Sequence, residues 1–190
     1  LTKLEDLYSF KYYGKFNIEK GPFNNQYQYF DQHNYAIVNI EKINYLKEAT
    51  QYFNTKYYIW LDFGYIRTNK KFPTNWPNKE KLYKIPTDKF TMLVGPYSKE
   101  NEWCTGGYGK GVSSYEGCSH NILIPGGTMI GTKSSIYKYH SIFFKKLDEI
   151  IKRGDYAGYD QMIHSECYCQ NKKLFNLIDA EKYKGSITGN

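Results

Sequence analysis

The stretch YYIWLDFGYIRT, residues 57–68, constrains the fold more than any other part of the chain. Its aromatic and aliphatic residues run directly into Asp62, and Gly64 follows two positions later. An apolar run of this length is typical of a buried strand, so we expect a strand over residues 56–63. A carboxylate at the end of such a strand is costly unless it is paired or bound. The pattern therefore indicates either a ligand site at Asp62 or an aspartate that caps the next turn.

Candidate strands and helices alternate along the chain. The expected strands lie at 35–40, 56–63, 89–95, 121–132 and 172–179, and the expected helices at 41–53, 134–153 and 158–169. This alternation predicts an α/β fold with a mostly parallel sheet flanked by helices, in a single domain over residues 1–190. Ligands of such sheets bind beyond the carboxyl ends of the strands, where Asp62 would lie.

Glycines mark a second candidate site in PGGTMIG, residues 125–131. Gly126 and Gly127 follow an apolar run and precede a helix that Ser134 or Ser135 can cap. Their spacing matches neither the Walker loop nor the Rossmann fingerprint. The missing side chains either leave room for a ligand beside the strand or mark a β-bulge without a ligand.

A third candidate site lies in GYDQMIH, residues 158–164. On a helix, Asp160 and His164 are four positions apart and share a face. Such a pair can bind one metal ion, act as an oriented acid and base, or form a surface hydrogen bond. Gln161 carries no signal by itself.

Composition restricts the partners. Lys and Arg number 26 against 19 Asp and Glu, which gives a net charge of +7 and favours anionic partners, or solubility alone. The 21 tyrosines suit sugar stacking, although an AT-rich genome also explains them. We find no RRM, KH or helix-turn-helix signature, which disfavours a nucleic-acid binder. No apolar stretch is long enough to cross a bilayer and no signal peptide is visible, so we expect a soluble cytoplasmic protein.

The cysteines and the longest polar segment complete the sequence pattern. The four cysteines lack the C-x-x-C spacing of a zinc site, so we expect free thiols, with a Cys104–Cys118 bridge as the alternative. The Gly-rich and Ser-rich segment 101–119 is expected to be a long loop that covers a site.

Taken together, these segments resemble one known family. The W-x-D-x-G-Y-x-R stretch at 60–67, the G-G-x-x-x-G-T-K stretch at 126–133 and the Y-D-Q stretch at 159–161 occur in that order, after Lys42 on a predicted helix. In residue type, order and spacing they resemble the HtrL/YibB (WlaTC) family of proposed glycosyltransferases, over roughly residues 35–180.

The resemblance implies a GT-A-like, Rossmann-like fold that uses a nucleotide-sugar donor, often with Mn²⁺ bound to an Asp-x-Asp motif. Asp62 matches the first aspartate of that motif, but Gly64 stands where the second would be. We expect Mn²⁺ at Asp62, with His164 or Asp160 replacing the missing carboxylate. The alternative is a metal-free reaction in which basic residues neutralise the diphosphate. About sixty residues precede Asp62 without a clear β–α start, so we expect part of the N-terminal nucleotide-binding region to be missing, or a minimal version of the fold.

The resemblance predicts transfer of a hexose, glucose or galactose, from a UDP-sugar to a hydroxyl of a glycan or glycoprotein, such as hydroxylysine of a collagen-like protein. The expected donor-binding residues are Lys42, Asp62, Gly64, Arg67, Gly126 and Gly127, and the expected catalytic residues are Asp160 and Gln161. Asp160 would act as general base if the configuration inverts, or stabilise positive charge on the sugar if it is retained. The alternative is a non-catalytic carbohydrate-binding module, which would not need Asp62 and Asp160.

Overall fold

The computed structural model describes residues 3–17, 32–62, 77–94 and 124–179, and the structural statements below refer to these ranges. The expected long loop at 101–119 lies outside them, as do Gly64 and Arg67.

Four described strands form one mixed sheet in the order β1–β3–β2–β4. They are β1 (Tyr58–Leu61), β2 (Phe90–Val94), β3 (Thr128–Gly131) and β4 (Phe175–Asp179). Strand β3 pairs antiparallel with β1 and β2, whereas β2 and β4 are parallel. The expected positions of these four strands are confirmed, but a mostly parallel sheet is wrong for the described strands. Periodicity locates a strand, whereas its direction depends on pairing between distant segments.

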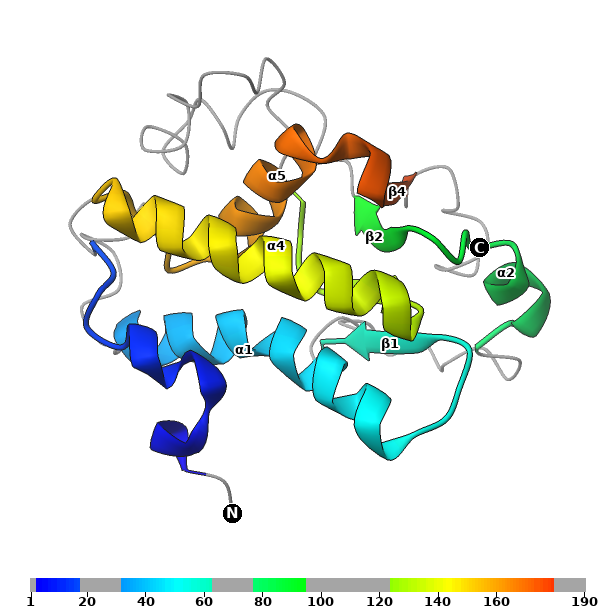
Figure 1. Ribbon diagram of the computed structural model, residues 1–190, viewed down its shortest axis with the longest axis horizontal. Helices are drawn as coiled ribbons and strands as arrows, with labels where there is room; N and C mark the ends of the chain where they lie inside the picture. Colours follow the sequence, from blue (N-terminus) through cyan, green and yellow to red (C-terminus); the bar gives the residue numbers. More distant parts are fainter. Residues whose placement is uncertain (1–2, 18–31, 63–76, 95–123, 180–190) are drawn as a thin grey trace, which may run out of the picture.

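Two long helices lie side by side, α1 (Gln32–Tyr52) and α4 (Lys133–Lys152), and Figure 1 shows them crossing the molecule together. The strand expected at 35–40 is wrong, because these residues belong to α1. Ile37, Ile40 and Ile43 are fully buried at a spacing of three, which continues the helical period of the residues that follow. The β-branched residues at 35–40 are typical of a strand when this run is considered without the helical residues that follow it.

The ends of α4 follow from local chemistry. Thr132 is the N-cap, and it forms a capping box with Ser135, so the expected cap at Ser134 or Ser135 is wrong by two or three positions. The backbone N–H of Thr132 donates to Ser135 Oγ at 2.9 Å. Beyond the last turn, Gly154 has φ 71°, which ends the helix as expected. The apolar face of α4 includes the buried residues Ile136, Phe143, Leu147 and Ile150.

The remaining described elements are short. They are η1 (Leu4–Asp6), η2 (Tyr8–Tyr12), α2 (Lys79–Tyr83), α5 (Asp160–Gln170) and η6 (Lys172–Leu174). Helix α5 confirms the expected helix at 158–169. It packs on α4 and also contacts α1, and Figure 1 shows its later turns above α4, away from α1. The core includes Tyr139 of α4, whose ring stacks on Phe90 of β2 with centroids 4.2 Å apart.

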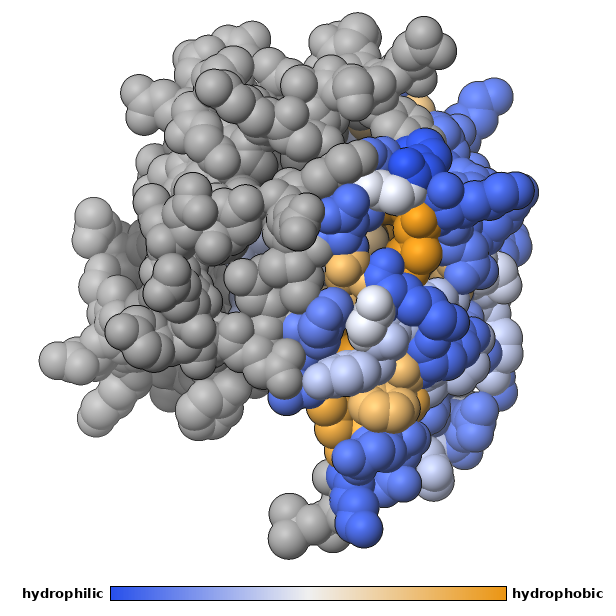
Figure 2. All heavy atoms as spheres, turned by 90° about the vertical axis from the view of Figure 1, so that its left-hand side faces the viewer, coloured by the Kyte–Doolittle hydropathy of each residue, from blue (hydrophilic) through white to orange (hydrophobic). Residues whose placement is uncertain are grey.

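One face of the described part is mostly polar. The face shown in Figure 2 is largely hydrophilic, with small apolar areas between charged side chains. No described helix has both the length and the apolar character that a membrane span requires. Cys167 is buried and free, which confirms the expected free thiol at this position. Cys169 is disulfide-bonded, so the expected free thiol is wrong there.

Candidate functional site

Lys42 joins two carboxylates that are far apart in the sequence. Its Nζ donates to Asp62 Oδ2 at 3.0 Å and to Asp160 Oδ2 at 3.1 Å. Lys42 comes from the middle of α1, Asp62 directly follows β1, and Asp160 is the first residue of α5. The sequence pattern selected all three residues, and the fold brings them together.

Asp62 is held by the end of the sheet. Its backbone N–H donates to the carbonyl oxygen of Gly127 at 2.9 Å, which extends the pairing of β1 with β3 by one residue. Its Oδ1 accepts a hydrogen bond of 2.7 Å from the indole N–H of Trp60. The Asp62 side chain is 34% exposed, so it is the most exposed of the three charged side chains Lys42, Asp62 and Asp160. Its side chain contacts Trp60 and Lys42, which hold it in place.

Asp160 lies behind Lys42 and is almost fully buried. Its side chain is 5% exposed, against 13% for Lys42. Its Oδ1 accepts the backbone N–H of Gln161 at 2.9 Å, at the positive end of α5. Burial raises the pKa of Asp160, against the opposing effect of Lys42. Burial also lowers the pKa of Lys42, but Asp160 and Asp62 outweigh it and leave that pKa above its ordinary value, so the ammonium stays charged.

His164 lies one turn after Asp160 and is 1% exposed, which excludes a surface hydrogen bond between them. Its Nε2 is 3.8 Å from Asp160 Oδ2, beyond hydrogen-bonding distance, and has no hydrogen-bond partner among the described residues. Its Nδ1 forms a short hydrogen bond with the hydroxyl of Tyr139 on α4. Burial lowers the pKa of His164 to about 3, so the imidazole is neutral at pH 7.

Gly126 is a glycine because the site itself fills the space beside it. A Cβ at this position would overlap the Asp160 carboxylate and lie 2.9 Å from His164 Nε2. Gly127 contributes through its backbone carbonyl, which binds Asp62. Steric overlap therefore explains the glycine at position 126 without either a ligand or a β-bulge. Donor binding by Gly126 and Gly127 stays a prediction.

Five polar side chains thus lie in a series, which we call the polar chain: Tyr139, His164, Asp160, Lys42 and Asp62. Hydrogen bonds join its neighbours except His164 and Asp160, which are 3.8 Å apart. It begins at a fully buried tyrosine and ends at a half-buried aspartate. A ligand would therefore meet the Asp62 end of the polar chain first, where two carboxylates share the Lys42 ammonium.

Within the described ranges, no group of three or more His, Cys, Asp and Glu side chains could hold a metal ion. Both carboxylate oxygens of Asp62 already have protein partners, and His164 Nε2 faces Asp160. Metal binding by Asp62 and His164 therefore stays a prediction.

Tyr139 was not among the predicted site residues. Its position three residues after Ile136 and four before Phe143 places a hydroxyl on the apolar face of α4. A buried tyrosine hydroxyl usually requires a hydrogen-bond partner, and this requirement could have indicated from the sequence that Tyr139 contacts another polar side chain. The partner itself depends on how α4 packs against α5.

Comparison with known proteins gives a family but no characterised relative. Neither the search of curated proteins nor the search of solved structures found a match. A family model described as "Bacterial protein of unknown function (HtrL_YibB)" matches residues 23–185. The chain therefore belongs to the HtrL_YibB family.

Proposed function

We propose that this protein is a glycosyltransferase with a GT-A-like fold that transfers a hexose from a UDP-sugar to a hydroxyl of a glycan or glycoprotein. The observation that carries the proposal is the Lys42 ammonium, held between Asp62 and Asp160 at the partly exposed end of the polar chain. Two carboxylates and a fixed cation suit a reaction in which a diphosphate leaves and a hydroxyl loses its proton.

In this proposal Lys42 binds the diphosphate of the donor. Its ammonium lies between Asp62 and Asp160, and by turning away from Asp160 it would supply positive charge where negative charge develops on the leaving group. Asp62 is the most exposed of the charged groups and contacts the donor first. Asp160 and Gln161 at the start of α5 act on the sugar or the acceptor once Lys42 has turned towards the diphosphate.

In this proposal Mn²⁺ binds together with the UDP-sugar donor. Divalent cations at nucleotide sites are commonly held by one or two carboxylates together with phosphate oxygens and water. Asp62 would be the protein ligand of such an ion, which would neutralise the leaving diphosphate.

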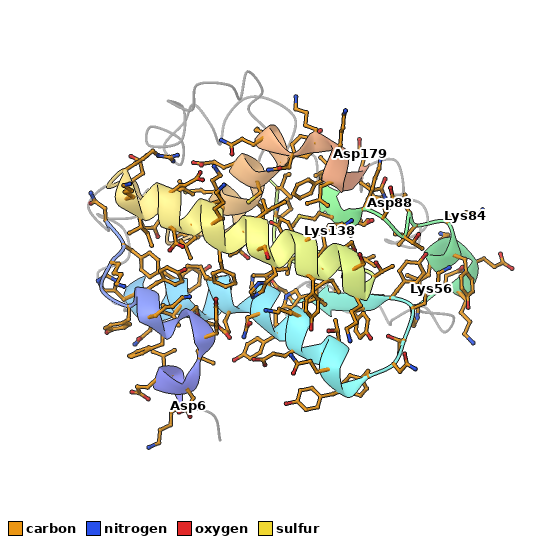
Figure 3. All side chains as sticks on the ribbon, in the orientation of Figure 1. Asp6, Lys56, Lys84, Asp88, Lys138 and Asp179 are labelled. Carbon is orange, nitrogen blue, oxygen red and sulfur yellow. The ribbon has the colours of Figure 1, made fainter. Side chains whose placement is uncertain are left out.

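Hydrolysis of UDP-glucose and UDP-galactose without acceptor tests the proposal, measured with MnCl₂ and separately with EDTA. We expect Asp62→Asn and Lys42→Met to lower the rate at least ~100-fold, because each removes a charge at the leaving group. Asp88→Asn is the matched control, since Asp88 is an exposed aspartate outside the polar chain (Figure 3). Hydrolysis at the wild-type rate by Asp62→Asn would contradict the assignment of Asp62.

A non-catalytic carbohydrate-binding module is the second candidate, and exposed aromatic side chains favour it. Tyr35 and Tyr45 are 48% and 37% exposed on α1, one on each side of Lys42 along the helix. Their rings contact Tyr159 and Trp60 respectively. Such a module would bind free oligosaccharides and would hydrolyse neither UDP-sugar, whereas the transferase hydrolyses donor slowly.

A further inference from the structure

We propose that His164, oriented by Tyr139, is a positioning residue that takes over as hydrogen-bond partner of Asp160 when Lys42 turns to an anionic ligand. The exchange during donor binding rests on the proposed function. The orientation of the imidazole and its response to loss of Lys42 do not.

The geometry places two groups on the same carboxylate oxygen. Asp160 Oδ2 accepts from Lys42 Nζ at 3.1 Å, and His164 Nε2 lies 3.8 Å from the same atom. The imidazole is within an ångström of hydrogen-bonding distance, and its Nε2 has no other partner in the described part of the chain. Because Gly126 has no side chain, no Cβ separates the two groups.

The tautomer of His164 follows from its neighbours. Burial raises the pKa of Tyr139 well above its ordinary value, so the phenol keeps its proton. If that proton is donated to Nδ1, the imidazole carries its own hydrogen on Nε2, where it points at Asp160. The opposite tautomer would direct the Nε2 lone pair at a carboxylate in a buried site, which is electrostatically unfavourable. Both neighbours therefore favour hydrogen on Nε2.

The exchange solves a problem that the burial of Asp160 creates. A carboxylate that is 5% exposed is strongly destabilised if its cationic partner leaves. If Lys42 moved to a diphosphate and no second donor were present, Asp160 Oδ2 would lose its hydrogen-bond partner. The Nε2–H group supplies that donor, because a small shift of either side chain closes the 3.8 Å distance.

Nitrogen NMR of the imidazole rings in the full-length wild-type protein tests the first step. We expect the His164 ring to show hydrogen on Nε2, with the signal assigned by its absence from His164→Gln. A ring that carries its hydrogen on Nδ1 would overturn the proposal, since Nε2 would then have nothing to donate.

Lys42→Met tests the second step without any ligand. We expect the His164 Nε2–H proton to move downfield and to exchange more slowly with solvent, because its hydrogen bond to Asp160 has formed. The signal of His140, a buried histidine that contacts Asn44, is the internal reference and should stay unchanged. A folded variant with an unchanged His164 signal would overturn the proposal. If the variant does not fold, the wild-type protein titrated with pyrophosphate and with UDP provides the same measurement.

These outcomes separate the inference from the proposed function. An absence of UDP-sugar hydrolysis, together with a downfield His164 signal in Lys42→Met, would reject the transferase and retain the hydrogen-bond exchange. Hydrolysis that depends on Lys42, together with a His164 signal that does not respond, would retain the transferase and reject the exchange.

Discussion

Gly126 is the residue at which the site tolerates the least change. We expect Gly126→Ala to lower the free energy of unfolding by about 1–3 kcal/mol, because the new Cβ displaces the Asp160 carboxylate and a buried neighbour. The same displacement separates Asp160 from Lys42, so UDP binding should weaken as well. Thermal unfolding and calorimetry with UDP measure the two effects.

Gly14→Ala is the matched control for this substitution. Gly14 has φ 75° and nothing within 4 Å of its added Cβ, so the variant loses stability through backbone strain alone. It should reduce the melting temperature and leave UDP affinity unchanged. Equal affinity for UDP in the two variants would show that Gly126 does not support the site.

Among the elements, η2 depends on one buried carboxylate of α1. Glu41 is 1% exposed, and it accepts the backbone N–H of Ser9 at 2.8 Å and that of Tyr8 at 3.3 Å. These N–H groups belong to the first turn of η2 and have no carbonyl partner within that helix. Asn44 Nδ2 donates to the same carboxylate at 2.8 Å. Glu41 therefore links η2 by hydrogen bonds to α1, the helix that contains Lys42.

We expect Glu41→Gln to lower the free energy of unfolding by about 1–3 kcal/mol, since one buried acceptor is replaced by a donor that faces another N–H group. Urea denaturation measures the loss, and hydrogen exchange should show faster opening of residues 8–12. Glu48→Gln is the control, because Glu48 is exposed on the same helix and accepts from the same Asn44 at 3.0 Å. A similar loss in both variants would mean that burial of Glu41 contributes nothing.

The sequence predicted the elements better than their arrangement. Asp62 and Asp160 were found because one ends an apolar run and the other begins a helix, and both are local patterns. The direction of β3 was not predictable in this way, because it depends on which strands meet across the chain. The contact of Tyr139 with His164 depends on the packing of α4 against α5, so the buried half of the polar chain was missed.

At the scale of the whole molecule, two buried histidines of the described residues couple folding to pH. Burial is the main cause that lowers the pKa of His140 to about 4, with Lys47 and Lys11 adding to it, and the pKa of His164 to about 3. Both values lie below the ordinary value of 6.5, so the fold favours the neutral form of each ring. Their contribution to stability is complete above pH 6.5 and is lost as the pH falls from 6.5 towards 4.

The free energy of unfolding should therefore decrease below pH 6.5, by on the order of 2 kcal/mol per histidine near pH 4.5–5. The raised pKa of Asp160 acts in the opposite direction, because protonation of this buried acid becomes easier in the fold as the pH falls. Urea denaturation between pH 7.5 and pH 4.5 measures the balance. His140→Gln removes one titrating ring and should make the decrease about half as steep, since His164 still titrates. A decrease as steep as in the wild-type protein would show that His140 is not held neutral by its burial between α1 and α4.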